Sequence, residues 1–269
     1  MSDDENTNKN EDQMVEPKQN TKGTLEPLLN MRYPASICLV SKSFSGKSWL
    51  LNSLLYHLAK KGRLHDAPTQ IIVFAGSSDV DTEYTSFLPR ENVRRGWNEQ
   101  TAARILALHK KKIDLLRRQS ERAKAPVKCP HVIFLLEDII GVNNVNTSTS
   151  KVLQFLFTQG RHYYVSTLVS SQSATVALNP TIRLNASAIV WSVLSQDHLK
   201  HIWRATTGMT WPQFLAFSSN LKQYEFGFFD NIGNTGIHIV KAADFPQGKW
   251  FLKNKEKNKN DKRKKKNKE

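Results

Sequence analysis

The chain has 269 residues, 39% of them hydrophobic, with 39 Lys and Arg against 24 Asp and Glu and a formal net charge of +15. This length and composition can bury one sizeable core, which excludes a miniprotein held together by disulfides. The excess of positive charge predicts a polyanionic partner, and nucleic acid is the first candidate. The first 20 residues hold six acids and two bases and the last 17 hold ten bases and three acids, which leaves +12 on residues 21–252.

The cysteines and the hydropathy pattern favour a soluble intracellular protein. Cys38 and Cys129 have no second Cys or His at metal-ligand spacing, which is typical of buried thiols in a reducing compartment. No apolar run approaches the roughly 18 residues of a membrane helix. The amino terminus is acidic rather than a basic and then apolar signal. We therefore expect no membrane association.

Three segments are expected along the chain. Residues 1–25 are predicted to be a disordered acidic leader, because almost nothing in them can be buried. Residues 26–252 are expected to form one folded domain. Residues 253–269 are predicted to be a disordered basic tail. Three interpretations of this tail remain open: a sequence-independent DNA contact, a nuclear localisation signal in KRKKK, and a solubilising segment.

From residue 36 onward, β-type runs alternate with amphipathic helical stretches, a pattern typical of a parallel sheet covered by helices. Strands are expected at Ser36–Val40, Gln70–Ala75, Val132–Leu136, Tyr164–Ser170 and Ala188–Val193. Helices are expected at Lys47–Lys60, Asn98–Lys124, Ser150–Gln159, Gln196–Thr207 and Trp211–Ser219. Residues 224–240 are predicted to form a closing hairpin around an Asn- and Gly-containing turn. The predicted fold is a three-layer α/β sandwich with a mostly parallel sheet of at least five strands.

A phosphate-binding motif follows the first expected strand. It consists of Ser41, Lys42, Ser43, Phe44, Ser45, Gly46, Lys47 and Ser48, here called the phosphate loop. The segment matches G-x-x-x-x-G-K-[ST] except that Ser41 stands at the first Gly. In such a loop, backbone N–H groups face the phosphates, Lys47 reaches the β and γ oxygens, and Ser48 supplies a hydroxyl to Mg²⁺. The alternative is a chance Gly-Lys-Ser, which rarely has a strand before it and a helix after it.

Two adjacent carboxylates, Glu137 and Asp138, end the apolar run that begins at His131. A nucleotide hydrolase needs one acid at such a strand tip for the Mg²⁺ shell and another for the attacking water. Glu137 is assigned the metal role and Asp138 the water role. The usual order is Asp and then Glu, so the reverse assignment stays open. The competing interpretation is an ordinary solvated strand end.

A third motif runs from Gln159 to Gln172. Gln172 ends a predicted strand, where a polar side chain can contact the γ-phosphate or the attacking water. Arg161 precedes that strand and is a candidate arginine finger, a guanidinium that neutralises charge in the phosphoryl-transfer transition state of a neighbouring site. A surface or DNA-contacting Arg is the alternative for Arg161.

These motifs together carry a resemblance. SKSFSGKS, the FLLED strand, GRHYYVSTLVSSQ and NPTIRLNASAIVWS resemble the poxvirus-type DNA-packaging ATPases. That group belongs to the FtsK-HerA branch of P-loop ATPases and also occurs in large cytoplasmic DNA viruses, virophages and Polinton-like elements. The resemblance implies a motor that hydrolyses ATP with Mg²⁺, assembles as a homo-oligomeric ring and moves double-stranded DNA into a preformed capsid, whose vertex protein is a candidate partner. It also implies a location in the host cytoplasm or nucleus, or in the virion.

The resemblance transfers to particular residues. Matching positions are Lys47 and Ser48 for phosphate and Mg²⁺, Glu137 and Asp138 for the acidic pair, Arg161 for the finger, and Gln172 for the strand-tip sensor. It further implies that the strand bearing Gln172 lies between the phosphate-loop strand and the acidic strand. Residues 26–252 are thus expected to be a P-loop ATPase domain.

Two rival functions remain. One is a nucleotide-gated module that binds DNA or capsid with little or no turnover, which the Ser41 substitution and the inverted acidic pair keep open. The other is a small-molecule kinase, which fits the loop but has no need of a net charge of +12 on its folded part.

A basic band is a further candidate for DNA contact, with a solvated helix face as the alternative. It comprises Arg94, Arg95, Lys110, Lys111, Lys112, Arg117, Arg118, Arg122 and Lys124.

Overall fold

The computed structural model describes residues 23–60, 69–76, 83–141, 145–206, 208–233 and 236–246. Its strands are β1 (Ser36–Val40), β2 (Thr69–Ala75), β3 (Val93–Arg95), β4 (His131–Glu137), β5 (Val165–Ser171), β6 (Ala188–Trp191), β7 (Phe226–Asp230) and β8 (Ile237–Val240). Its α-helices are α1 (Glu26–Leu29), α2 (Lys47–Lys60), α4 (Glu99–Ala123), α5 (Lys151–Thr158), α6 (Ala174–Ala177), α7 (Pro180–Asn185), α8 (Gln196–Trp203) and α9 (Trp211–Ser219). The described residues also include the 3₁₀ helices η1 (Arg90–Asn92) and η3 (Gly160–Tyr163).

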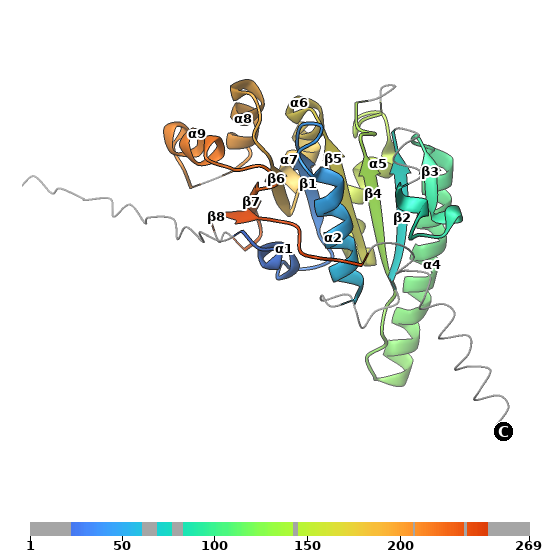
Figure 1. Cartoon of the computed structure of the whole chain (residues 1–269). Coiled ribbons are helices and arrows are strands. Elements are labelled where there is room, and N and C mark those ends of the chain that lie inside the picture. The colour runs from blue at the N-terminus through green and yellow to red at the C-terminus, as the bar shows by residue number, and fades with distance from the viewer. Residues whose placement is uncertain are drawn as a thin grey trace, which may run out of the picture.

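All eight strands form one sheet in the order β3-β2-β4-β5-β1-β6-β7-β8 (Figure 1). The strands from β3 to β6 pair in parallel, and β6, β7 and β8 pair antiparallel, so the last two strands form a hairpin. The helices α1 and α2 cover one face, and the helices from α4 to α9 cover the other. These layers confirm the predicted three-layer α/β sandwich.

The central strands are buried on both faces, which explains the nearly apolar sequences of β1 and β4 and the small hydroxyl side chains that β5 carries among its Val and Leu residues. Every residue of β1, β4 and β5 is buried. One core cluster fills the space under α1 and α2, and the other lies beneath α4 to α9. Trp191 is fully buried, and its indole N–H donates to Ser218 Oγ at 3.0 Å.

The predicted strand order around the site is confirmed. β5 lies between β4 and β1. Because these three strands are parallel, their carboxyl ends meet at one edge of the sheet, where ligands bind in open α/β folds. Among the described residues, no helix has both the length and the apolar character needed to cross a membrane.

Several local expectations differ from the structure. The strand β3 was not predicted, since it has only three residues and two of them are arginines. The helix expected to reach residue 207 ends at Trp203, and the strand expected to reach residue 193 ends at Trp191. The short helices α1, α6 and α7 were also not predicted, because four to six residues are too few to show a helical period.

The boundary of the predicted leader falls inside packed structure. Thr24 forms an isolated β-bridge with Val240, and Leu25 is buried in the core beneath α1. The remaining leader residues, 1–22, and the predicted tail, 253–269, lie outside the described residues. The division into leader, domain and tail therefore stays a prediction.

Candidate functional site

The phosphate loop connects β1 to α2 at the shared edge of the sheet. The backbone N–H of Ser41 donates to Ser171 O at 3.0 Å, which ties the loop to the end of β5. Leu50 N–H donates to Gly46 O at 2.9 Å and closes the first turn of α2. The earliest N–H groups of that helix have no carbonyl before them within the helix, so they can face an anion.

Glycine is required at only one of the two glycine positions of the motif. Gly46 has φ +87°, and a Cβ at this position would lie 2.7 Å from Cδ1 of Tyr224. Both the backbone conformation and the close aromatic ring exclude a larger residue there. Ser41 is not among the residues with positive φ, and its N–H is already bonded to β5. The departure from the motif at Ser41 is therefore compatible with the loop geometry.

Lys47 and Asp138 form an ion pair across the end of the sheet. Nζ of Lys47 lies 2.7 Å from Oδ2 of Asp138, and their side chains are 9% and 32% exposed. Asp138 has φ 49°, a left-handed conformation that turns the chain directly after β4. Its N–H donates to Ser170 O at 3.0 Å, which fixes this turn against β5. The local turn thus aims the carboxylate at the phosphate-loop lysine.

Ser48 and Glu137 form a second contact beside the first. The hydroxyl of Ser48 donates to Oε1 of Glu137 at 3.2 Å. Glu137 is 1% exposed, and its Oε2 has no hydrogen-bond partner within the described part of the chain. Burial raises the pKa of Glu137 above its ordinary value, and the nearby Tyr84 hydroxyl, followed by the positive charge of Lys47, opposes this rise. A buried carboxylate oxygen without a partner is suited to receive a cation.

Gln172 connects the acidic pair to the phosphate loop. Its Oε1 accepts from the hydroxyl of Ser43 at 3.1 Å, and its Nε2 donates to Oδ2 of Asp138 at 3.5 Å. Gln172 follows β5 directly, so the central position of β5 brings it between the two flanking strands. The structure therefore brings together Gln172, the acidic pair and the phosphate loop.

Arg161 lies at the other end of β5. It belongs to η3, which precedes the strand, and its side chain is exposed. The seven residues of β5 separate it from Gln172, and at a rise of about 3.3 Å per residue they span roughly 20 Å. Arg161 cannot reach the Lys47 site of its own chain across that distance.

Sequence reasoning missed a third carboxylate near the site. Glu83 accepts a hydrogen bond from the amide of Asn52 on α2, and burial raises its pKa. The neighbouring Tyr84 is fully buried, and burial together with the negative charge of Glu137 raises the pKa of Tyr84 well above its ordinary value. A possible signal was the position of this segment after β2, whose carboxyl end adjoins that of β4.

The basic band is only partly free to contact a ligand. Nζ of Lys110 lies over the rings of Phe155 and Tyr163, at 4.6 and 4.8 Å from their centroids. Arg117 lies over the Tyr163 ring and donates to His162 O. The exposed bases of α4 include Lys111, Arg118 and Arg122. The carboxyl half of this helix extends past the sheet (Figure 1). DNA contact by this band stays a prediction.

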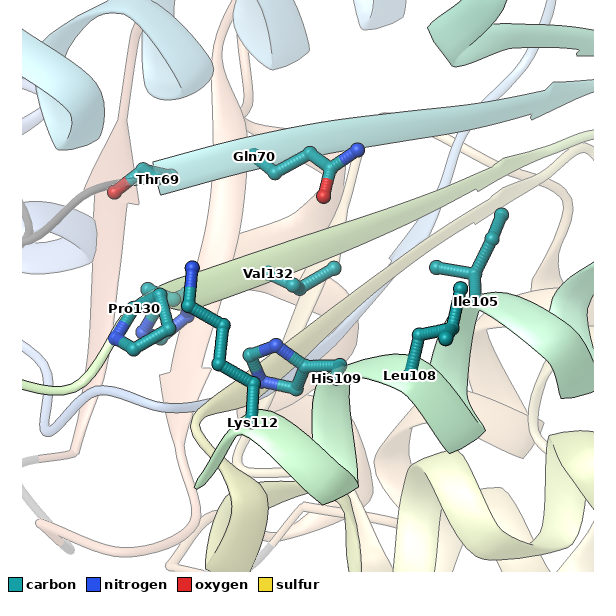
Figure 2. A pocket seen from close by; sticks show the side chains of 9 residues that line it. Thr69, Gln70, Ile105, Leu108, His109, Lys112, Pro130 and Val132 are labelled. Atoms are coloured by element: carbon teal, nitrogen blue, oxygen red, sulfur yellow. The ribbon is translucent and has the colours of Figure 1, made fainter. Parts of the chain in front are cut away.

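A cavity of about 350 Å³ lies between α4 and the amino ends of β2 and β4, away from the phosphate loop. Figure 2 shows Lys112 and the ring of His109 facing it from α4, with Gln70 opposite. Nε2 of His109 contacts Tyr163 O at 2.7 Å, and Nε2 of His131 contacts Ser166 Oγ at 3.0 Å. Both rings are therefore held by the fold, which makes this cavity a structural feature of the α4 interface.

His131 makes stability depend on pH. Burial lowers its pKa to about 3, with a smaller effect from His109, whereas an unfolded His titrates near 6.5. The unfolded chain therefore binds the proton more readily, so stability is greatest above about pH 6.5 and falls as pH decreases toward 3. At pH 5 the loss relative to pH 7 is expected to be about 2 kcal/mol.

Urea denaturation between pH 5 and 8 measures this slope. The variant His131→Gln keeps a partner for Ser166 but does not titrate, so its stability should change less with pH than that of the wild type. His109 is also buried with a lowered pKa, so some slope remains in the variant. Parallel pH profiles for the two proteins would contradict the assignment to His131.

Two viral proteins are similar to this chain in sequence. No protein-family model matches the sequence. The chain is 23% identical over 218 residues to the uncharacterized protein 075L of Invertebrate iridescent virus 6, covering 81% of this chain and 74% of that protein. It is 26% identical over 222 residues to the uncharacterized protein L437 of Acanthamoeba polyphaga mimivirus, covering 80% of this chain and 72% of the relative.

Among solved structures, the fold is similar to that of the genome packaging NTPase B204 from Sulfolobus turreted icosahedral virus 2. The TM-score is 0.53 and the sequence identity 17%, with 78% of this chain and 97% of B204 covered. The similarity confirms the fold that the resemblance implied, a P-loop α/β sandwich shared with a viral genome-packaging NTPase.

Proposed function

We propose that this protein is a viral DNA-packaging ATPase of the FtsK-HerA type, which hydrolyses ATP to move double-stranded DNA into a capsid. One observation carries the proposal: the ends of β1, β4 and β5 bring Lys47, an acidic pair and Gln172 into one bonded cluster. The viral relatives support a role in infected cells. The similarly folded B204 has been solved with AMPPCP and with ATP-gammaS, which supports nucleotide binding.

In this proposal the phosphate loop binds the triphosphate through its backbone N–H groups and through Lys47. The ammonium of Lys47 then exchanges its contact with Asp138 for one with the phosphate oxygens. Asp138 becomes available to orient the attacking water and accept its proton. The amide of Gln172, which contacts both Asp138 and the loop, is placed to respond to the γ-phosphate.

Ser48 and Glu137 fit a Mg²⁺ ion. Both offer oxygen atoms, which Mg²⁺ prefers, and Oε2 of Glu137 is buried without a hydrogen-bond partner among the residues described. Mg²⁺ is usually held by one or two protein side chains together with substrate phosphates. When bound, the ion would neutralise negative charge on the phosphate oxygens. The contact between Ser48 and Glu137 favours Glu137 over Asp138 as the metal ligand.

The net charge and the position of Arg161 indicate which partners this function would need. A net +12 on residues 21–252 suits double-stranded DNA, whose phosphates bind such surfaces independently of sequence. Because Arg161 lies far from the site of its own chain, a finger role requires a neighbouring copy, which the proposed homo-oligomeric ring would supply. A capsid vertex protein is the partner that packaging would further require.

DNA-stimulated ATP hydrolysis tests the proposal. The variant Lys47→Ala loses a charge-assisted contact to phosphate, so we expect ATP affinity to fall by about 10- to 100-fold and hydrolysis to fall with it. The exposed Lys151→Ala on α5 is the matched control and should behave like the wild type. An ATPase activity indifferent to Lys47→Ala would exclude this site as its source.

The same assay separates the alternatives. ATP binding without turnover, even with duplex DNA present, would support the nucleotide-gated binding module. The inverted order of Glu137 and Asp138 favours that alternative, because the water-activating side chain is one methylene shorter than usual. Transfer of phosphate to a nucleoside or nucleotide would instead identify a kinase.

A further inference from the structure

A cleft of about 490 Å³ opens beside the phosphate loop, on the side away from the acidic pair. It is lined by Gly46, Trp49, Tyr224, Phe226, Lys241 and Ala242. Its volume lies within the range of small-molecule sites. None of the motifs in the sequence indicated this cleft, because it joins α2 to a hairpin almost two hundred residues further along the chain.

Trp49 forms part of the cleft wall, and its ring packs against a neighbouring segment of the chain. It follows Ser48 directly on the first turn of α2, and its side chain is 48% exposed. The ring of Phe245 lies against it, with centroids 4.6 Å apart. Residues 241–246 run along α2, where Ser53 Oγ donates to Ala243 O at 2.7 Å and accepts from Ala243 N–H at 2.9 Å.

Tyr224 is a second aromatic residue of the lining. It has φ 66°, an uncommon conformation for an aromatic residue, and it is 57% exposed. Its ring covers Gly46, since its Cδ1 lies 2.7 Å from the position that a Cβ on this glycine would occupy. Two exposed aromatic rings therefore border the loop that is proposed to hold the phosphates.

We propose that this cleft binds the base and sugar of the nucleoside triphosphate by ring stacking on Trp49 and Tyr224, with little discrimination between purine bases. The inference rests on the proposed function, because it needs the phosphates to lie on the loop from Gly46 to Ser48. A triphosphate held there has its nucleoside end at the mouth of the adjoining cleft. Aromatic stacking suits any base, because every base has a π-face.

The polar groups of the cleft explain the weak discrimination. Lys241 is the one charged side chain in its lining, and its Nζ is bound to Oε1 of Glu225 at 2.7 Å. An ammonium can only donate, and adenine and guanine both present the N7 acceptor. The lining has no Asn, Gln, Asp or Glu side chain to distinguish an amino group from a carbonyl on the base.

Binding titrations of full-length protein with ATP, GTP and inorganic tripolyphosphate test the proposal. For Trp49→Ala we expect ATP and GTP affinity to fall alike by about 5- to 150-fold, the range that base stacking supplies, with tripolyphosphate unchanged. Trp49→Phe should restore most of the loss. Ile232→Ala, an exposed position in the hairpin turn outside the cleft lining, should match the wild type.

The outcomes separate this inference from the proposed function. Unchanged ATP and GTP affinity in Trp49→Ala would overturn the stacking site, and so would an equal loss of tripolyphosphate binding. A wild-type preference above tenfold for one purine would overturn the weak discrimination. If wild-type protein bound none of the three probes, and Lys47→Ala changed nothing, the proposed function itself would fail together with the cleft.

Discussion

Under the proposed function, replacing Arg161 with Ala should leave ATP binding nearly intact and lower hydrolysis by about 10³- to 10⁵-fold, the effect of losing an arginine finger. The reason is geometric: Arg161 is exposed at the amino end of β5, whereas Lys47 and Gln172 lie at the carboxyl end. A guanidinium in that position can stabilise a transition state only in a neighbouring copy. Single-turnover hydrolysis and ATP titration together measure the two quantities.

Mixing two inactive variants gives the decisive control for Arg161. Arg161→Ala and Lys47→Ala proteins should complement each other, because a ring can combine an intact site with an intact finger from the next copy. The exposed Arg204→Ala is the matched charge control and should hydrolyse ATP normally. Equal losses of binding and hydrolysis in Arg161→Ala would indicate a folding or DNA-contact role instead.

The variant Asp138→Asn should lower hydrolysis by about 10²- to 10⁴-fold, which is the usual contribution of a general base. ATP binding should persist or tighten, because Asn no longer competes as an anion for the ammonium of Lys47. Glu137→Gln should behave differently and mainly raise the Mg²⁺ concentration needed for activity. Titrating Mg²⁺ against each variant therefore assigns the two carboxylates.

The reverse pattern would exchange these roles. Suppose instead that Asp138→Asn raised the Mg²⁺ requirement and Glu137→Gln abolished turnover at saturating Mg²⁺. Asp138 would then be the metal ligand and Glu137 the residue that activates water. If neither variant affected hydrolysis, the acidic pair would be a structural strand end, the competing interpretation of the motif.

Much of the fold could be predicted because burial on both faces constrains sequence strongly. β1 and β4 are largely apolar runs, β5 mixes Val and Leu with Ser and Thr, and each was predicted to within one or two residues. β3 was not, since an edge strand of Val93, Arg94 and Arg95 pairs on one side only and carries no such pattern. The hydrophobic pattern of a segment reflects where its residues are buried. A short edge strand is partly buried and partly exposed, so it shows no clear pattern.

The candidate site, like the fold, could be predicted only in part from the sequence. The phosphate loop and the acidic pair are local motifs, and their spacing alone identified them as candidates. Glu83 and Tyr224 could not be found, because folding brings them near the loop from separate segments without a shared pattern. Trp49 directly follows the loop in the sequence, but only the fold shows that it lines a cleft together with Tyr224. The separation of Arg161 from Gln172 did follow from the sequence, because a strand was expected between them and the structure has one there.

The contact between Lys47 and Asp138 has a consequence for the end of a catalytic cycle. The single ammonium of Lys47 has two competing anions, a carboxylate built into the fold and whatever phosphate reaches the loop. The free energy of phosphate binding through Lys47 is therefore the difference between the lysine–phosphate and the lysine–Asp138 ion pairs, and not the full free energy of the first. Under the proposed function, Asp138 would take back the lysine as products depart, so the protein would help to expel its own inorganic phosphate and ADP.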